Sequence, residues 1–331
     1  MVETPVLLDV VAPDIDRIEK AIRADIDNLS GDLDKLLVEI LKYGLFGGGK
    51  RFRPLLAVVS SRLCENFRED IYELAIAFEY LHLATLFHDD VIDQADTRRG
   101  RAAVCKVYGV SAAILAGDFL HARSMEIIGR HGGVDALDIF CQATRGMVDG
   151  EFIQLRNTQN YNQSEDDYFE AINGKTALLI SATAEIGGLA GGADAIEQKA
   201  LREYGRNLGY GFQIVDDLLD YLGDELKTGK AVGNDLAEGK MTLPLIIAME
   251  HAHKKDKEKL LHILTSSEEK VASFSEVYDL ISKYNGFGLA RKKAEQCMSK
   301  AIEALAVFPE KKQKDREILA GLARYALHRE K

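Results

Sequence analysis

The chain alternates long stretches of helical hydrophobic periodicity with short breaks that are rich in glycine or charge. In residues 14–43, apolar side chains recur at intervals of three and four, as on one face of an amphipathic helix. Residues 70–93 are apolar on nearly every side, a pattern that predicts a buried central helix. A further helix is expected to open at Pro54, because proline suits the first helical turn.

The rest of the chain is predicted to be helical as well. The expected helices are 111–131, 134–158, 164–192 and 194–222, with helical patterning from Leu243 to the end that is interrupted near 266–269 and near Pro309. No segment has the alternation of a strand bounded by hairpin turns, and no linker divides the chain. The pattern predicts an all-α, single-domain protein that comprises residues 1–331.

Composition and net charge limit the classes of partner and the compartment that we expect for the protein. The net charge is −11, which disfavours nucleic acid and anionic membranes as partners. The four cysteines include no C-x-x-C pair, so we expect no zinc site, no disulfide framework and a reducing compartment. Residues 1–11 lack the pattern of a signal peptide, and no apolar run is long enough for a transmembrane segment. We therefore expect a cytoplasmic protein.

Two aspartate clusters of the form D-D-x-x-D end two of the apolar helices. The first cluster is Asp89, Asp90 and Asp93, and the second cluster is Asp216, Asp217 and Asp220. Residues four apart share a helix face, so the outer aspartates of each cluster point the same way. Their mutual repulsion calls for a cation, and magnesium takes one or two carboxylates and completes its shell with water and phosphate oxygens. One such cluster could be a solvated helix end, whereas two copies favour metal binding.

Basic residues stand after a triple glycine and after each aspartate cluster. They are Lys50, Arg51 and Arg53 after Gly47–Gly49, Arg98 and Arg99 after the first cluster, and Lys230 and Lys240 after the second. A glycine-rich turn before a helix start favours an anion through its backbone amides and the helix dipole. Any one of these residues could be plain surface charge, but the alternation of acids and bases along the chain favours phosphate binding.

Three further positions belong to this pattern. His82 lies two helical turns before the first cluster, on the same face, and is either a phosphate contact or a core histidine. Lys175 and Thr176 follow a glycine inside a predicted helix, where the lysine could be buried toward a site. Gln213 lies one turn before the second cluster and is expected to face the same side.

Together these residues resemble the trans-polyprenyl diphosphate synthase family, over roughly residues 20–330. The segments that carry the resemblance are Gly48–Pro54, His82–Asp93 with Arg98–Gly100, Ala116–Leu120, Gly150–Leu155, Lys175-Thr176, Phe212–Asp220 and Gly239–Pro244, in the family's order. One departure is Cys105-Lys106-Val107, which we do not expect to touch the chemistry. The resemblance implies an antiparallel helical bundle around a central cavity, of the isoprenoid synthase type and usually homodimeric.

The resemblance also implies a role for each candidate residue. The diphosphate of isopentenyl diphosphate would be held by Lys50, Arg53, His82 and Arg99. The allylic diphosphate would face Arg98, Lys175, Thr176, Gln213, Lys230 and Lys240. Magnesium, as three ions with substrate bound, would be held mainly by Asp89, Asp93 and Asp216, with Asp90, Asp217 and Asp220 as ligands or close neighbours. Catalysis would depend on Arg98, Lys175, Lys230 and Gln213, which face the charge that builds on the departing pyrophosphate.

Product length is predicted from the helix that precedes the first cluster. The growing tail would run back past Thr85, Ala84, Leu81 and Ala77. In the family, aromatic side chains at the near positions give short products, so the small residues here predict a long, octaprenyl-class product of the kind used for quinone side chains. Alternatively, Ala84 only permits tight helix packing and Leu81 or Phe119 closes the cavity, which would give a farnesyl or geranylgeranyl product.

Two rival functions share part of this pattern. A class I terpene cyclase uses the same metal-assisted ionisation but needs no second diphosphate site, and Lys50, Arg53 and Arg99 argue against it. A non-catalytic subunit of a heteromeric synthase would be expected to have lost acidic residues, and both clusters are intact. A transient membrane contact for product release stays open.

Overall fold

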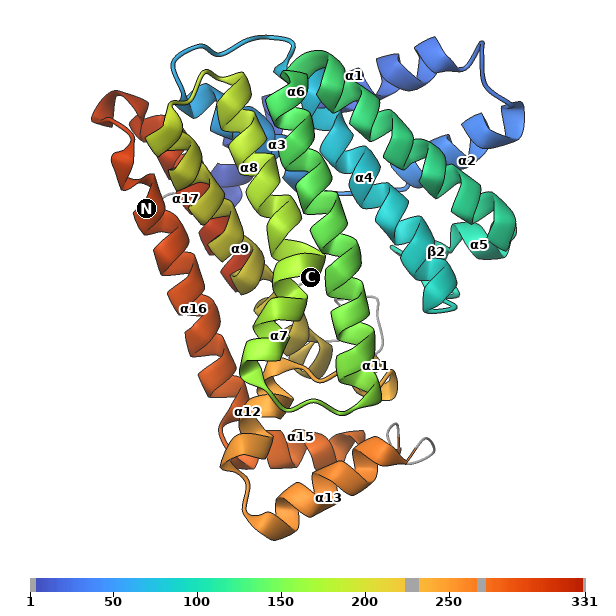
Figure 1. Ribbon diagram of the computed structural model, residues 1–331, viewed down its shortest axis with the longest axis vertical. Coiled ribbons are helices and arrows are strands. Elements are labelled where there is room, and N and C mark those ends of the chain that lie inside the picture. Colours follow the sequence, from blue (N-terminus) through green and yellow to red (C-terminus); the bar gives the residue numbers. More distant parts are fainter. Residues whose placement is uncertain (1–3, 224–231, 267–271, 330–331) are drawn as a thin grey trace. The chain divides into compact units, whose positions relative to one another are not determined.

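The computed structural model describes residues 4–223, 232–266 and 272–329, and these residues are almost entirely helical (Figure 1). The first part contains α1 (Thr4–Leu29), α2 (Lys35–Leu45), α3 (Phe52–Leu63), α4 (Ile71–Ile92), β1 (Thr97–Arg98), β2 (Arg101–Ala102), α5 (Val104–Val107) and α6 (Val110–Gln159). Next come α7 (Glu165–Ile172), a π-helical turn (Asn173–Ala177), α8 (Leu178–Ala190), α9 (Ala195–Leu222) and α11 (Asn234–Ala237). The last part contains α12 (Leu243–His251), α13 (Lys254–Thr265), α15 (Phe274–Lys283), α16 (Gly286–Ala304), two 3₁₀ turns (Leu305–Val307 and Glu310–Lys312) and α17 (Gln313–His328). The all-α prediction is confirmed.

The helix boundaries differ from the prediction in several places. α1 begins at Thr4 and α3 begins at Phe52, both earlier than expected, and two of the expected helices are divided. The helix expected over 14–43 is divided into α1 and α2, because the side chain of Asp34 caps α2 by accepting a hydrogen bond from Leu36 N at 2.8 Å. The helix expected over 164–192 is interrupted by the π-helical turn, which no hydrophobic periodicity announces. The break expected between 131 and 134 is confirmed at Gly133, whose φ of 78° and ψ of −171° are not helical.

A short hairpin replaces the polar loop that was expected after the first aspartate cluster. β1 and β2 are antiparallel, and Thr97 pairs with Ala102. The connecting residues Arg99 and Gly100 have φ values of 52° and 73°, and two positive φ values are typical of a tight two-residue hairpin turn. The hairpin therefore fixes the directions in which Arg98 and Arg99 leave the backbone.

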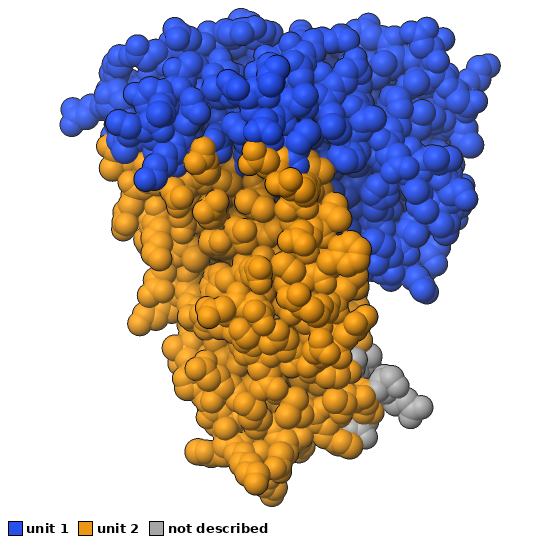
Figure 2. Space-filling view, in the orientation of Figure 1, with its two compact units in different colours: residues 1–141, 182–201, 307–321 blue, residues 142–181, 202–306, 322–331 orange. Residues whose placement is uncertain are grey.

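The chain forms two compact units, coloured separately in Figure 2. Unit 1 comprises residues 1–141, 182–201 and 307–321. Within it α1, α3 and α4 pack on one another, and α4 is buried on most sides, as its apolar pattern predicts. On α8, a Cβ at Gly187 would lie only 2.4 Å from the carbonyl oxygen of Ala57, so this glycine permits close contact with α3.

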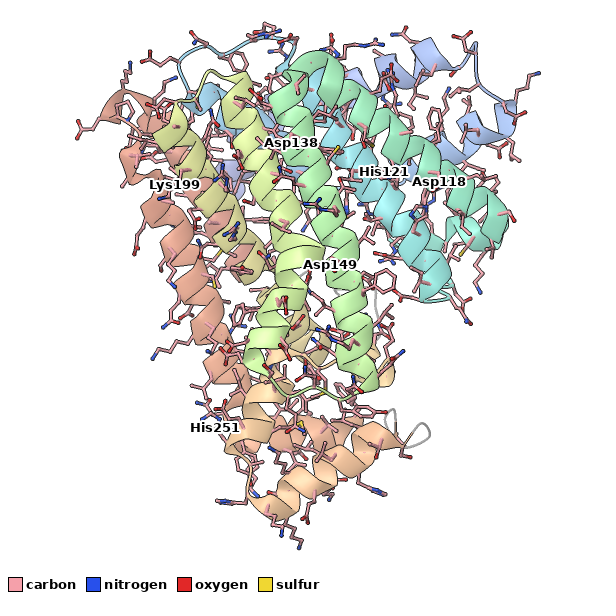
Figure 3. All side chains as sticks on the ribbon, in the orientation of Figure 1. Asp118, His121, Asp138, Asp149, Lys199 and His251 are labelled. Carbon is pink, nitrogen blue, oxygen red and sulfur yellow. The ribbon has the colours of Figure 1, made fainter. Side chains whose placement is uncertain are left out.

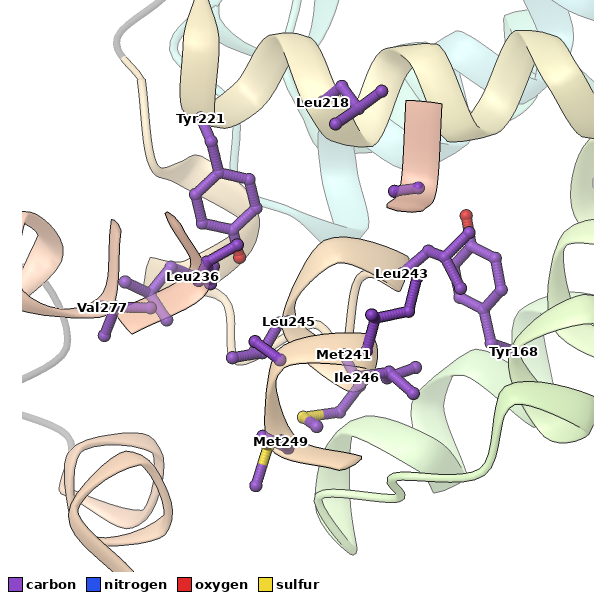
Figure 4. Close-up of a cluster of buried hydrophobic side chains, with 14 of the residues drawn as sticks. Tyr168, Leu218, Tyr221, Leu236, Met241, Leu243, Leu245, Ile246, Met249 and Val277 are labelled. Atoms are coloured by element: carbon purple, nitrogen blue, oxygen red, sulfur yellow. The ribbon is translucent and has the colours of Figure 1, made fainter. Parts of the chain in front are cut away.

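Unit 2 comprises residues 142–181, 202–306 and 322–331. Its hydrophobic core surrounds α12, which packs against α7, α15 and α16. Figure 4 shows Tyr168, Leu218 and Tyr221 directed toward this core, together with Leu243. The same helix that ends in the second aspartate cluster thus buries its apolar residues in the core of unit 2. Within the described ranges, every helix is too short or too polar to span a bilayer.

Candidate active site

The first aspartate cluster lies at the carboxyl end of α4 in unit 1. Its middle residue, Asp90, is 2% exposed, and its Oδ1 accepts hydrogen bonds from Nε and Nη2 of Arg98 at 2.8 and 2.5 Å. Asp89 is half-buried, and Asp93 is exposed and ends α4, with its backbone N–H donating to Asp89 O at 2.8 Å. The hairpin therefore returns Arg98 to the cluster, where it neutralises the buried carboxylate.

Four predicted phosphate contacts come together in unit 1, and we call Arg53, His82, Arg98 and Arg99 the cation group. Burial lowers the pKa of His82 well below its ordinary value, and the charges of Arg53, Arg99, Arg98 and also Arg51 lower it further. His82 is therefore neutral at pH 7 and retains one ring N–H donor. The cation group comes from α3, α4 and the hairpin. Basic residues that are dispersed along the sequence thus lie close together in unit 1.

The glycine loop before α3 adjoins the cation group. Arg99 donates from Nη1 to the carbonyl oxygen of Gly48. A Cβ at Gly49 would lie 2.9 Å from Arg99 Nη1, so glycine is needed for this approach. Burial lowers the pKa of the Arg99 guanidinium, as do the nearby charges of Arg51 and Arg98. Lys50 is exposed at the end of this loop, beside the helix start.

The Ala116–Leu120 segment packs α6 against α4 within unit 1. A Cβ at Gly117 would lie 2.4 Å from Nε2 of His88, so the glycine admits the histidine ring. His88 Nε2 also lies 3.4 Å from the carboxylate of Asp118, which Figure 3 labels on α6. The departure at Cys105 is buried nearby, where its Sγ contacts the backbone oxygens of Asp90 and Ala95 at 3.6 and 3.8 Å, not the carboxylates.

The second aspartate cluster, at the end of α9 in unit 2, also buries its middle residue. Asp217 Oδ2 accepts from Tyr168 Oη at 2.7 Å and from Leu243 N at 3.4 Å, and Oδ1 accepts from Gln213 Nε2 at 3.1 Å. Burial and, to a smaller extent, the charge of Asp235 raise the pKa of Asp217 to about 7, against the lowering effect of these three hydrogen bonds. Asp217 is therefore partly protonated at neutral pH.

The outer residues of the second cluster have different surroundings. Burial, followed by the charge of Asp235, raises the pKa of Asp220 to about 6, and Asp220 Oδ2 accepts from Asp235 N at 3.0 Å. Asp216 has a side chain that is 44% exposed, and it forms an ion pair of 2.5 Å with Nη2 of Arg329. The guanidinium of Arg329 also lies 3.7 Å from the ring centroid of Phe212.

A polar pocket of about 100 Å³ in unit 2 is lined by three of the residues predicted to face the allylic diphosphate, namely Lys175, Gln213 and Lys240. Its lining includes Lys175, Gln213, Asp217 and Lys240, and Thr176 lies beside it, donating from Oγ1 to Gln213 Oε1 at 2.9 Å. In this structure the two lysines are paired with acids, Lys175 with Glu151 at 2.8 Å and Lys240 with Asp235 at 3.4 Å and with Glu238. Lys230 lies outside the described residues.

The sequence interpretation missed three residues of this pocket region. Asp235 changes the pKa of both Asp217 and Asp220, Tyr168 holds Asp217, and Glu151 holds Lys175. Asp235 stands five residues before Lys240 in a glycine-bounded acidic stretch, a signal that could have found it. Tyr168 carries no such signal, because only the packing of α7 brings it to α9.

The donor set of both clusters fits magnesium. In the part of the chain that the structure describes, no three side chains of His, Cys, Asp or Glu form a preformed metal cage. Each cluster instead presents hard carboxylate oxygens and already binds one cationic side chain, Arg98 or Arg329. Such a set suits an ion that takes few protein ligands and completes its shell from water and phosphate.

The predicted chain-length residues lie on α4 of unit 1. Ala77, Leu81 and Ala84 are 0%, 1% and 2% exposed, so each is fully packed in this structure. Thr85 is half-buried, and its Oγ1 donates to His82 O at 2.8 Å. A prenyl tail that passes Ala84 therefore displaces neighbouring side chains from this face of α4.

Comparison with known proteins indicates the same family as the sequence motifs do. The family model described as polyprenyl synthetase matches residues 34–281. An octaprenyl diphosphate synthase of Escherichia coli (strain K12) is 36% identical over 325 residues, which are 98% of each chain. A short chain isoprenyl diphosphate synthase of Methanothermobacter thermautotrophicus is 34% identical over 328 residues, 98% of this chain and 99% of the relative.

The solved structures include a polyprenyl synthase from Caulobacter crescentus CB15 complexed with calcium and isoprenyl diphosphate. It has a TM-score of 0.91 and 34% identity, and the comparison covers 99% of this chain and 98% of that chain. The fold, the sequence motifs and the near-complete coverage of these relatives all indicate the same family. The chain therefore belongs to the polyprenyl synthetase family and is a trans-prenyltransferase with the all-α isoprenoid synthase fold.

Proposed function

We propose that the protein condenses isopentenyl diphosphate with an allylic diphosphate such as farnesyl diphosphate, with magnesium, and releases a long all-trans polyprenyl diphosphate of the octaprenyl class. The observation that carries this proposal is that the basic and polar residues predicted to bind phosphate gather in two sets. Unit 1 holds the cation group, and unit 2 holds the lysine-containing pocket beside the second cluster. A reaction between two diphosphates needs both, whereas a terpene cyclase needs one.

The proposed mechanism assigns the isopentenyl diphosphate to Lys50 and the cation group of unit 1. His82, being neutral, donates a ring N–H to a phosphate oxygen and adds no charge to a site already rich in arginine. Arg99 adds a forked donor set that matches a phosphate group. These residues hold the nucleophilic alkene in place while the other substrate ionises.

The allylic diphosphate is assigned to Arg98, Lys175, Lys230 and Lys240, with Thr176 and Gln213. Asp89, Asp93 and Asp216 would hold magnesium, which would supply positive charge to the departing diphosphate. Lys175 and Lys240 exchange their partners Glu151 and Asp235 for phosphate oxygens when substrate binds. The alkene of isopentenyl diphosphate then forms the new carbon–carbon bond, and the proton lost from the adduct passes to the released pyrophosphate.

The reaction class and the product length are tested by one experiment. Purified protein is incubated with magnesium, radiolabelled isopentenyl diphosphate and farnesyl diphosphate, and the products are sized by chromatography. The long-product proposal expects a ladder that ends at octaprenyl diphosphate, the product suited to a quinone side chain. A ladder that stops at geranylgeranyl diphosphate would overturn it.

A short-chain product is the second candidate, and two observations favour it. The short-chain relative is nearly as similar to this chain as the octaprenyl relative, and Ala77, Leu81 and Ala84 are fully packed. The variant Ala84→Phe separates the candidates. If the tail passes Ala84, the product shortens while turnover of the first condensation is retained; if the product is already short, its length stays unchanged.

We also propose a homodimer, supported by exposed apolar residues on α6. In its unit 2 part, Val148, Phe152 and Leu155 are 53%, 67% and 43% exposed and share one helix face. Light scattering of Phe152→Glu should give a monomer, whereas Ile196→Glu, at a residue on α9 that is 68% exposed, should remain a dimer. A Phe152→Glu protein that stays dimeric would exclude this face of α6 as the interface.

A further inference from the structure

Among the basic residues that follow the triple glycine, Lys50 and Arg53 are proposed to bind phosphate, whereas Arg51 has no role in the proposed function. Its side chain is only 2% exposed, and it immediately precedes α3 between Lys50 and Arg53. Its φ of 50° and ψ of 36° are left-handed, a conformation that costs a non-glycine residue roughly 1 kcal/mol. A residue held in such a conformation needs strong contacts that keep it there.

The guanidinium of Arg51 makes those contacts with three separate elements of unit 1. Nε donates to Glu19 Oε1 on α1 and Nη1 donates to Glu79 Oε1 on α4, both at 2.6 Å. Nη2 donates to the carbonyl oxygen of Leu45 at the end of α2. Arg51 therefore ties the start of α3 to α1, α2 and α4 at one point, and because its side chain is 2% exposed, little of it is accessible to a substrate.

The glycine loop is shaped by the same side chain. Gly48 and Gly49 have φ values of 97° and 147°, so the backbone is left-handed at three of four successive positions that end with Arg51. A Cβ at Gly49 would lie 3.2 Å from Arg51 Nη1 and 2.9 Å from Arg99 Nη1. The two guanidinium groups thus enclose this part of the loop, which ends at Lys50.

Glu79 supplies the charge that lets these arginines lie together. Burial lowers the pKa of Arg51, and the charge of Glu79 and the hydrogen bonds that Arg51 donates to Glu19 and Glu79 raise it by more. The pKa of Arg99 is lowered by burial, and the charge of Glu79 offsets part of this effect and of the repulsion from Arg51. Glu79 is itself 4% exposed, so it is a buried counter-ion for both cations.

We infer that Arg51 and Glu79 form a positioning pair for the isopentenyl diphosphate subsite: they hold Lys50, Arg53 and Arg99 in the arrangement that binds phosphate, without touching the substrate. This inference rests on the proposed function of the cation group. It assigns to Arg51 a role in affinity for one substrate only, because its hydrogen bonds to Glu19, Glu79 and Leu45 lie in unit 1 beside the cation group.

The test compares Arg51→Lys, Arg51→Gly and Glu79→Gln by steady-state kinetics and by calorimetric titration with isopentenyl diphosphate alone. Arg51→Lys keeps the charge but loses the fork, and the KM for isopentenyl diphosphate should rise about 10-fold while the KM for farnesyl diphosphate stays within about twofold. Arg51→Gly relieves the backbone strain but removes every side-chain contact, and its affinity should fall more than that of Arg51→Lys. Glu79→Gln should resemble Arg51→Lys.

Arg62→Lys is the matched control. Arg62 is on the same helix and likewise binds two carboxylates, Asp315 at 2.6 Å and Asp14 at 2.8 Å, but it lies at the far end of α3. Its loss should lower thermal stability and leave the KM for isopentenyl diphosphate unchanged. If both arginine variants changed stability alone, or if Arg51→Gly bound as well as the wild type, the inference would be overturned.

A further variant separates this inference from the proposed function. Lys50→Ala removes a proposed direct contact and should weaken binding of isopentenyl diphosphate in the same titration. If Lys50→Ala weakens binding and the Arg51 variants do not, only the positioning role is wrong. If none of these variants changes binding, the assignment of the subsite itself is wrong.

Discussion

The two aspartate clusters have the same sequence pattern and bury the same middle residue, but the chain compensates that burial differently. In unit 1, Asp90 meets the positive charge of Arg98. In unit 2, the described residues that donate hydrogen bonds to Asp217 are neutral, namely Tyr168, Gln213 and the backbone of Leu243, and burial raises its pKa to about 7. The comparison teaches that one motif can be paired with a cation in one place and held by neutral hydrogen-bond donors in another.

The outer aspartates differ as well. Asp216 is paired with Arg329, near the end of the chain, whereas Asp93 is exposed and ends its helix. Asp220 is close to a further acid, Asp235, and Arg98 is the charge nearest the buried carboxylate of the first cluster. The following experiments test whether these differences matter for metal binding, from the largest expected effect to the smallest.

Removal of an outer ligand should have the largest effect. Asp89→Ala in unit 1 and Asp216→Ala in unit 2 should each lower kcat by about 1,000-fold or more, because the pyrophosphate loses the ion that stabilises its charge. Magnesium titrations of activity measure both. Asp135→Asn, at an exposed position of α6, should leave activity unchanged. Full activity of either alanine variant would show that its cluster is not a metal site.

Loss of Arg98 in unit 1 should lower the free energy of unfolding. Arg98→Gln leaves the carboxylate of Asp90 buried without its cation and should lower the free energy of unfolding by about 2 kcal/mol, a value reduced for the partial exposure of Arg98. Tyr168→Phe removes one neutral hydrogen bond from Asp217 and should cost about 1 kcal/mol. Urea titrations without metal measure both, and the double variant Arg98→Gln/Asp90→Asn should recover part of the loss. Equal losses in the two units would contradict the comparison.

Metal binding to the second cluster should depend on pH. The pKa values of Asp217 and Asp220 are raised to about 7 and about 6, so both carboxylates take up protons as the pH falls from 8 to 6. Affinity for Mn²⁺, used as a spectroscopic probe for magnesium in the absence of phosphate, should fall about 10-fold over this range. The variant Asp220→Asn should flatten the profile. A flat profile in the wild-type protein would mean that the second cluster does not titrate in this range.

The smallest effect is expected from Arg329. Its ion pair with Asp216 competes with a metal ion for the same carboxylate, so Arg329→Gln should raise the affinity for Mn²⁺ about threefold. Lys293→Gln is the control, because it removes a similar positive charge of unit 2 that is bound to Glu165 at 2.5 Å instead. Weaker metal binding in Arg329→Gln would indicate that the arginine orients Asp216 and does not compete for it.

The sequence by itself determined the helices and the chemistry of the candidate residues. Helical periodicity, the position of Pro54 and the break at Gly133 act over a few residues, so they can be read along the chain. The two aspartate clusters and the basic residues after them indicated metal and phosphate for the same reason. The tight hairpin turn at Arg99 and Gly100 was missed because a strand pair of two residues has no periodicity.

Only the tertiary structure decided which acidic side chain pairs with which basic side chain. Lys50 and Arg51 are neighbours in sequence, yet one is exposed and the other is buried between Glu19 and Glu79. The surroundings of Asp217, and hence its pKa, depend on Tyr168 and Asp235, which packing brings close from other parts of the chain. Charge interactions inside a protein are set by distance and burial, and neither is written in the spacing of a motif.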